Sequence, residues 1–129
     1  MEDFVPFEIA KKLKEKGFTC EYPFAMYDVV GIFYALYTSA GYYNYYEYRD
    51  FDEHDCIAPT ISQALKWLEK EKKVFIDTKT HIDLNGNYHF SYSIIFNGKQ
   101  ERQDYTFFDW ERIDAYITAI DYALDNIIT

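Results

Sequence analysis

Cysteine is scarce in this chain of 129 residues, and the scarcity limits its chemistry. The two cysteines, Cys20 and Cys56, lie far apart and lack the CxxC spacing of a zinc or redox site. Two such thiols cannot build the disulfide framework of a small secreted domain. The pattern is typical of a protein kept in a reducing compartment.

Long apolar runs and a leader-like N-terminus are also lacking. The longest uninterrupted apolar run, from Val29 to Tyr37, is about half as long as a membrane-spanning helix requires. The first residues, Met1 to Asp3, are acidic and polar, unlike a secretory signal peptide. We therefore expect a cytoplasmic protein that does not bind membranes.

Positive charge is scarce as well. Lys plus Arg number 13 against 22 Asp plus Glu, which gives a net charge of -9 and no basic stripe for nucleic acid. The predicted order from Ile61 onward, a helix, three strands and a helix, matches a double-stranded RNA-binding domain. That domain needs basic residues where its final helix begins, and here Asp109, Glu111 and Asp114 stand there. We expect no nucleic-acid partner.

Length and apolar content point to a folded protein with a core. Hydrophobic residues make up 49% of the chain, and its length matches one ordinary domain. We predict a small single α+β domain over residues 1–129. In it an antiparallel β-meander packs against a long C-terminal helix, with two shorter helices at about 6–17 and 60–73 and a possible extra hairpin at 29–51.

Capping residues mark the ends of the helices. Pro6 suits the first turn of a helix, and Gly17 can take the left-handed conformation that ends one. Thr60 followed by Gln63 is a capping-box pattern. Asp109 is the predicted N-cap of the C-terminal helix. Each predicted helix therefore has a local start or stop signal.

The meander is predicted from two turn signals and the alternation between them. Asn85-Gly86-Asn87 and Asn97-Gly98 tolerate the positive φ of tight β-turns. The strand between them alternates apolar and polar side chains, as a strand with one buried face does. A three-residue loop at the first turn places Ile82 opposite Phe90.

The segment from Val29 to Thr38 fits two kinds of element. Its β-branched and aromatic residues favour a strand of a loose hairpin. A helix that starts at Asp28 is the alternative, since several of its apolar residues also recur with helical spacing. We prefer the strand.

Two sets of polar residues could carry chemistry. The predicted register puts His81, Asp83 and His89 on one exposed face, where they could hold a transition metal or zinc. His54 and Cys56 could serve as base and nucleophile, but no third group orients them, and nearby carboxylates should raise the thiol pKa. We predict no catalytic residue, no metal and no cofactor. A small metal-binding protein or enzyme that uses either set is the alternative function.

Tyrosines crowd the middle of the chain beside several carboxylates, at Tyr42, Tyr43, Tyr45, Tyr46 and Tyr48. They cannot all point into a core, and tyrosine is enriched at protein interfaces. Base stacking normally needs nearby Lys or Arg, and only Arg49 is present. The stretch predicts an acidic aromatic surface for another protein or for a homodimer. A layer that covers the side of a small sheet is an equal alternative.

Two segments carry a resemblance to a known family. Residues 7–18, with the letters KKLKEKGF, and residues 58–68, with APT and QALKWL, resemble a family of small uncharacterised proteins. The family is common in Bacteroidetes genomes, phages and prophages, and the resemblance covers most of the chain in outline. The resemblance implies no activity and no cofactor. It does imply an accessory role in a phage or another mobile element. Together with the aromatic surface, it predicts a noncatalytic protein-interaction or accessory protein.

Overall fold

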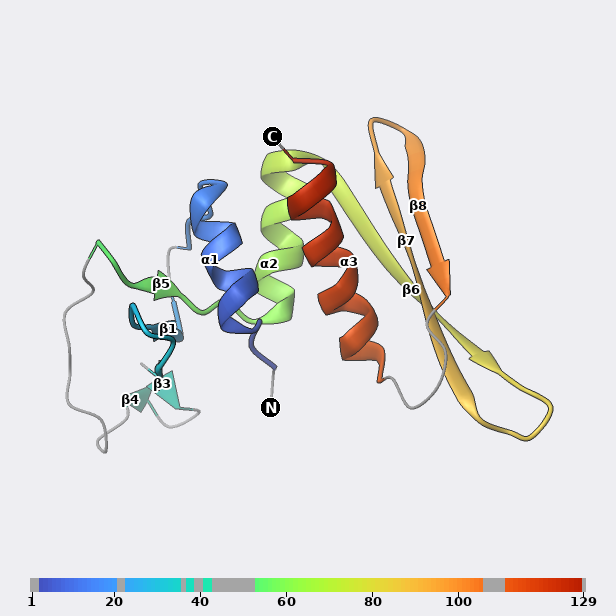
Figure 1. Ribbon diagram of the computed structural model, residues 1–129, viewed down its shortest axis with the longest axis horizontal. Coiled ribbons are helices and arrows are strands. Elements are labelled where there is room, and N and C mark those ends of the chain that lie inside the picture. The colour runs from blue at the N-terminus through green and yellow to red at the C-terminus, as the bar shows by residue number, and fades with distance from the viewer. Residues whose placement is uncertain are drawn as a thin grey trace. The chain divides into compact units, whose positions relative to one another are not determined.

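The computed structural model groups the chain into two compact units, Met1–Gln63 and Ala64–Thr129 (Figure 1). It describes residues 3–20, 23–35, 37–38, 41–42, 53–105 and 111–128. Both units combine helical residues with antiparallel strands, so the predicted α+β class is confirmed. That residues 1–129 form one domain stays a prediction.

The first helix of the chain, α1 (Phe7–Glu15), confirms the helix predicted at 6–17. Pro6 precedes its first turn, and Gly17 follows its last turn with a φ of 89°. The Phe18 amide donates a hydrogen bond to the Leu13 carbonyl at 2.9 Å, the bond that defines a Schellman motif. Both side chains are buried, so the local stop signal also closes the core of the first unit.

The described residues of the first unit contain five short strands. β1 (Ala25–Tyr27) pairs antiparallel with β2 (Phe33–Ala35) on one side and β5 (Cys56–Ile57) on the other. β3 (Tyr37–Thr38) pairs with β4 (Gly41–Tyr42). The described residues of the predicted hairpin at 29–51 are therefore strands and loops.

The strand interpretation of Val29 to Thr38 is confirmed for β2 and β3 and wrong at its start. The stretch from Asp28 to Ile32 is a hairpin loop, and the strand begins at Phe33. Hydrogen bonds from the Val30 and Ile32 amides to the Asp28 carboxylate override the strand preference of Val29 and Val30.

The second helix is α2 (Ile61–Trp67), continued by the π-helical turn η1 (Leu68–Lys72). Its capping box is formed as predicted. The Thr60 amide donates to Gln63 Oε1 at 3.0 Å, and the Gln63 amide donates to Thr60 Oγ1 at 3.1 Å. Lys73, with a φ of 56°, ends the helix, so the predicted span of 60–73 is confirmed.

The second unit is built on the predicted meander. β6 (Val74–Ile82), β7 (Tyr88–Phe96) and β8 (Lys99–Tyr105) form an antiparallel sheet in that order, and α3 (Arg112–Asn126) packs against β6 and β7. The β6–β7 hairpin extends past the end of β8 (Figure 1). None of the described helices is long and apolar enough to cross a membrane.

The core of the second unit lies between α3 and one face of the sheet. Val74, Ile76, Tyr92 and Ile94 alternate along their strands and are all buried, which confirms the predicted one-faced pattern. The helix contributes mainly small residues to the contact. Its fully buried side chains are Ala115, Ala119, Ile120, Ala123 and Leu124. The alanines let the backbone of α3 approach the sheet closely.

Two local predictions in this unit are wrong. The N-cap of α3 is Glu111, not Asp109, because Asp114 Oδ2 accepts the Glu111 amide at 2.9 Å and completes a capping box. The register of β6 and β7 is shifted by two residues, so that Ile82 lies opposite Tyr88 rather than Phe90. A shift of two keeps every side chain on its face, and alternation alone could not detect it.

Candidate functional site

The hairpin between β1 and β2 is closed by an aspartate side chain. Asp28 Oδ1 accepts the backbone amides of Val30 at 3.0 Å and Ile32 at 2.9 Å. The Asp28 amide in turn donates to the Ile32 carbonyl at 3.0 Å. Asp28 is only 7% exposed, so these bonds form largely away from water. We call residues 28–32 the Asp28 loop.

Gly31 is required for this loop. Its φ is 94°, a left-handed value that other residues adopt at a cost. Its amide donates to the Asp28 carbonyl at 3.0 Å. A Cβ atom at this position would also lie 2.8 Å from Cδ2 of Phe7 on α1. The aspartate and the glycine together hold the loop in one conformation.

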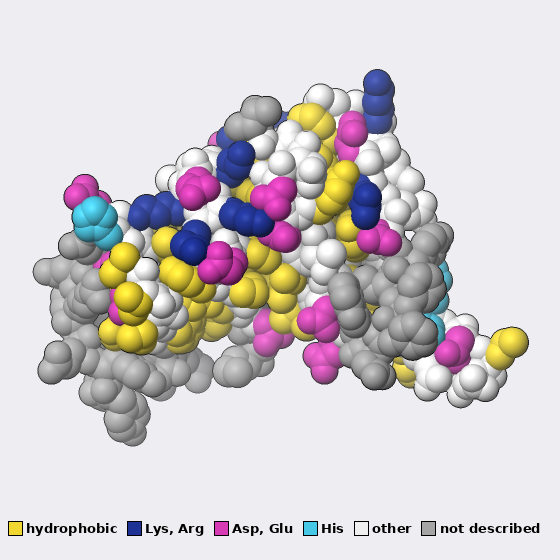
Figure 2. All heavy atoms as spheres, viewed as in Figure 1, with side chains coloured by type: hydrophobic (Ala, Val, Ile, Leu, Met, Phe, Trp, Pro, Cys, Tyr) yellow, Lys and Arg dark blue, Asp and Glu magenta, His cyan; other side chains and the backbone are white. Residues whose placement is uncertain are grey.

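The other three side chains of the Asp28 loop are apolar and face solvent. Val29 is 68% exposed, Val30 is 72% exposed and Ile32 is 53% exposed. Phe24 and Phe33 are also partly exposed. Hydrophobic side chains are seen gathered at the surface of the first unit in Figure 2. A run of exposed apolar residues on a fixed loop is typical of an interaction surface.

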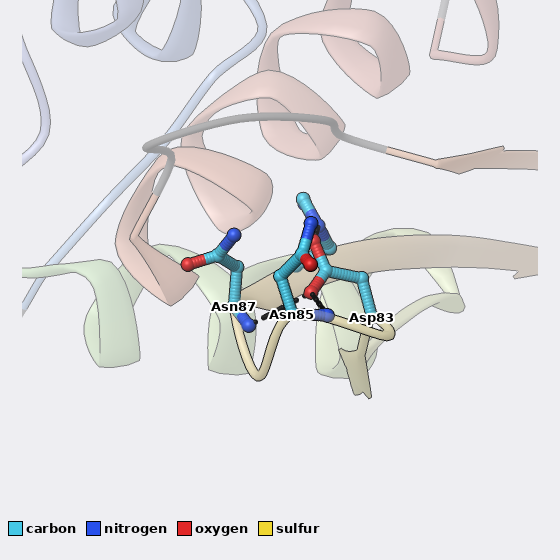
Figure 3. Close-up of polar contacts among 4 residues, drawn as sticks. Asp83, Asn85 and Asn87 are labelled. Atoms are coloured by element: carbon cyan, nitrogen blue, oxygen red, sulfur yellow. Dashed lines mark hydrogen bonds and ion pairs between the residues drawn. The ribbon is translucent and has the colours of Figure 1, made fainter.

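A second loop, between β6 and β7, has the same hydrogen bonds. Asp83 Oδ1 accepts the amides of Asn85 at 2.8 Å and Asn87 at 2.9 Å (Figure 3). The Asp83 amide donates to the Asn87 carbonyl at 3.0 Å, and the Gly86 amide donates to the Asp83 carbonyl at 3.1 Å. Gly86 has a φ of 81°. We call residues 83–87 the Asp83 loop; the two loops share the sequence pattern Asp-x-x-Gly-x.

The Asp83 loop differs from the Asp28 loop in its surroundings. The Asp83 side chain is 32% exposed, and His89 Nε2 donates to its Oδ2 at 2.9 Å. This hydrogen bond, with further bonds from the amides of Asn87 and Asn85, lowers the pKa of the Asp83 carboxyl to about 2. Leu84 at the loop's second position is fully exposed. Hydrophobic atoms are visible at the outer end of this hairpin in Figure 2.

The predicted metal-binding set is only partly brought together. The predicted register places Asp83 directly opposite His89, whereas in the structure Asp83 pairs with Asn87 and contacts His89 from the loop. His81 lies opposite His89, and its Nε2 atom contacts Ser91 Oγ at 2.8 Å. Within the described part of the chain, no group of three or more His, Cys, Asp or Glu residues could hold a metal ion.

The predicted pair of His54 and Cys56 lies in two different environments. Cys56 is 4% exposed, and burial raises the pKa of its thiol, more than the nearby Asp55 carboxylate does. The His54 side chain is 73% exposed. A buried thiol with a raised pKa is a poor nucleophile at neutral pH.

Residues 53–56 are only partly solvated: the side chains of Glu53 and His54 are exposed, whereas Asp55 and Cys56 are buried. Lys14 Nζ donates to the backbone carbonyls of Glu53 and Asp55, the latter at 2.8 Å. Asp55 is fully buried, and Cys56 belongs to β5. Lys14 thus links this segment to α1.

The tyrosine stretch is described at one position. Tyr42 belongs to β4, whereas Tyr43, Tyr45, Tyr46 and Tyr48 lie outside the described residues. Their role in an interface therefore stays a prediction.

The Asp28 loop was not predicted from the sequence. Its signal was an aspartate three positions before a glycine, at the start of an apolar run.

Comparison with known proteins identified no relative of this chain. The chain matches no protein-family model, and no curated protein or solved structure similar to it was found.

Proposed function

We propose that this chain is a noncatalytic protein-interaction protein and that the Asp28 loop belongs to its binding surface. The supporting observation is that the two loops have the same backbone hydrogen bonds and different side chains. At the three variable positions the Asp83 loop has Leu84, Asn85 and Asn87. Asn85 and Asn87 occupy the positions that Val30 and Ile32 occupy in the Asp28 loop. The loop backbone therefore does not require apolar side chains at these positions.

The Asp28 loop has the properties of a binding anchor. Its conformation is fixed before binding by a carboxylate and a glycine, so association costs little loop entropy. Each of its apolar side chains contributes roughly 1–2 kcal/mol when a partner covers it. Three adjacent side chains of this kind match the small apolar centre around which interfaces are organised.

Charge indicates the chemistry of the partner. The chain carries a net charge of -9, so a partner with an apolar cleft and a basic rim is favoured. Such pairing raises the association rate and makes it sensitive to salt. The predicted interface tyrosines, Tyr42, Tyr43, Tyr45, Tyr46 and Tyr48, follow the same hairpin in the sequence and would extend the surface with aromatic rings.

Location and biological setting are proposals of the same kind. Cys20 and Cys56 are both free thiols, which supports the cytoplasm. The resemblance of residues 7–18 and 58–68 to proteins of phages and prophages supports an accessory role in a mobile element.

The test compares two matched variants of the loops. Val29→Ser with Val30→Ser alters the Asp28 loop, and Leu84→Ser alters the Asp83 loop at the position equivalent to Val29. Each protein is immobilised and used for affinity capture, and any partner is then purified for a binary titration. We expect at least tenfold weaker binding by the double valine variant and unchanged binding by Leu84→Ser. Equal affinities for all three folded proteins would contradict the proposal.

The tyrosine stretch is tested separately. Tyr45→Ser with Tyr46→Ser should weaken binding of the same purified partner if the rings extend the surface. Unchanged affinity and oligomeric state would favour the alternative in which the rings cover a small sheet.

A further inference from the structure

The face of the meander that points away from α3 is polar and contains a groove. Ser91 and Ser93 on the central strand β7 form the floor of the groove, and Asp77 and Lys79 on β6 form one wall. Gln103 on β8 lies opposite Ser93 and belongs to the other wall. Serine is shorter than each of these neighbours, so the middle of the sheet is hollowed to a volume of about 290 Å³. We call this hollow the serine groove.

A β-bulge completes the second wall. Gln100 and Gln103 are three residues apart and would lie on opposite faces of a regular strand. The register between β7 and β8 shifts at Ile94 and Ile95, which brings both glutamines to the serine groove. Gln100 Nε2 donates a hydrogen bond to Gln103 Oε1 at 3.1 Å. Bulges commonly re-aim side chains at functional sites.

The floor of the groove is polar and held in place. Ser91 is 3% exposed, and its Oγ atom contacts His81 Nε2 at 2.8 Å. Central strands favour β-branched or aromatic residues, and two serines instead leave space above the backbone. Their hydroxyl groups can donate and accept hydrogen bonds. The groove therefore has the lining of a site for a small polar molecule.

The wall formed by β6 carries two opposite charges. Asp77 and Lys79 are both exposed, and neither has an ion-pair partner within the described residues. The charges of these two side chains cancel, although the chain carries a net charge of -9. A ligand with one ammonium group and one carboxylate complements this wall and forms a charge-assisted hydrogen bond with each side chain. A neutral ligand would leave both charges without a counter-charge.

We propose that the serine groove binds a free α-amino acid with an uncharged polar side chain. Asp77 binds its ammonium group, and Lys79 binds its carboxylate. The Cβ atoms of residues two apart on a strand are separated by about 7 Å. An α-amino acid with one charge-assisted hydrogen bond at each end spans about 8 Å. The flexible side chain of Lys79 accommodates this small difference.

The side chain of the ligand reaches the opposite wall. Neighbouring strands lie about 4.8 Å apart, so β6 and β8 are separated by about 10 Å. A side chain as long as that of glutamine crosses the two serines and places its amide beside Gln100 and Gln103. Amides both donate and accept hydrogen bonds, so these groups match. The serine groove is distinct from the Asp28 loop, and the inference does not rest on the proposed function.

Calorimetric titration of the full chain with L-glutamine tests the proposal. We expect saturable binding at millimolar ligand concentrations or below. N-acetyl-L-glutamine lacks the ammonium group and L-glutamine α-amide lacks the carboxylate, so each should bind about tenfold more weakly. Maltose, a neutral ligand rich in hydroxyl groups, should not bind. Absence of glutamine binding, equal binding of the three glutamine compounds, or displacement of glutamine by maltose would each overturn the proposal.

Matched variants locate the site. Asp77→Asn and Lys79→Gln each remove one charge from the serine groove, and each should weaken glutamine binding about tenfold. Asp125→Asn and Lys70→Gln remove the same charges from exposed positions outside the groove and should leave the affinity unchanged. Groove variants that bind glutamine like the parent would show that the ligand lies elsewhere and would overturn the proposal.

Two further variants test the floor and the independence of the site. Ser93→Leu fills the floor of the groove with an apolar side chain and should abolish glutamine binding; binding equal to that of the parent would contradict the assigned position. The double valine variant of the Asp28 loop should bind glutamine normally. Failure of this inference is therefore distinguishable from failure of the proposed function.

Discussion

The loops that follow β1 and β6 have the same backbone hydrogen bonds and different side chains. In each, an aspartate oxygen accepts the second and fourth amides that follow it, and a glycine with positive φ stands in between. Asp28 is buried and its loop carries valine and isoleucine, whereas Asp83 is partly exposed and its loop carries asparagine. The same loop backbone therefore accepts both apolar and polar side chains at its variable positions.

The largest expected effect is loss of the buried carboxylate. Asp28→Ala leaves the amides of Val30 and Ile32 without their acceptor and also removes the hydrogen bond from the Tyr34 hydroxyl to Asp28 Oδ2. We expect a loss of about 2–3 kcal/mol in the free energy of unfolding, measured by urea titration. Asp28→Asn keeps one oxygen acceptor and should cost less. If Asp83→Ala destabilised the chain as much as Asp28→Ala, the difference in burial would not matter and the comparison would fail.

Substitution of Gly31 should also cost more stability than substitution of Gly86. Gly31→Ala forces a left-handed alanine and places its Cβ against the Phe7 ring, so we expect a loss of about 2 kcal/mol. Gly86→Ala meets no atom within 4 Å, and only the cost of the backbone conformation, about 1 kcal/mol, remains. Thermal or urea unfolding of both variants measures the difference between the two losses in the free energy of unfolding. Equal losses would show that α1 yields to the added methyl group.

The smallest effect is a pH dependence confined to the Asp83 loop. The pKa of Asp83 is about 2 in the folded chain, below about 3.9 in an unfolded one. Its stabilising contribution is therefore complete above about pH 4 and is lost as the pH falls toward 2. The stability difference between the parent and Asp83→Asn should shrink over this range. A difference that stays constant from pH 5 to pH 2 would contradict the assigned hydrogen bonds.

Local signals in the sequence predicted the helices well. The Schellman motif at Gly17 and the capping box at Thr60 each depend on residues within one turn of the helix end. The N-cap of α3 was misplaced because Glu111 and Asp114 form a capping box without serine or threonine. For α3 the helix was predictable from the sequence, and its N-cap residue was not.

The loops were harder to predict because one side chain outweighs several preferences. Val29 and Val30 favour strands, yet the Asp28 carboxylate gathers the following amides into a loop. Asp83 does the same after β6, which moves the register by two residues. The interaction of Asp83 with His89 was predictable from proximity, because a shift of two keeps them on one face. The exposed apolar side chains of the Asp28 loop could be identified only from the structure.

Amide hydrogen exchange measured by NMR at Val30, Ile32, Asn85 and Asn87 tests the central claim most directly. If an aspartate holds each loop fixed and the Asp28 loop is the more rigid, all four amides exchange more slowly than in an unfolded chain. Val30 and Ile32 should then be the slowest, and Asp28→Asn should speed them without affecting Asn85 and Asn87. Exchange of Val30 and Ile32 at the unprotected rate would contradict a preformed apolar binding loop.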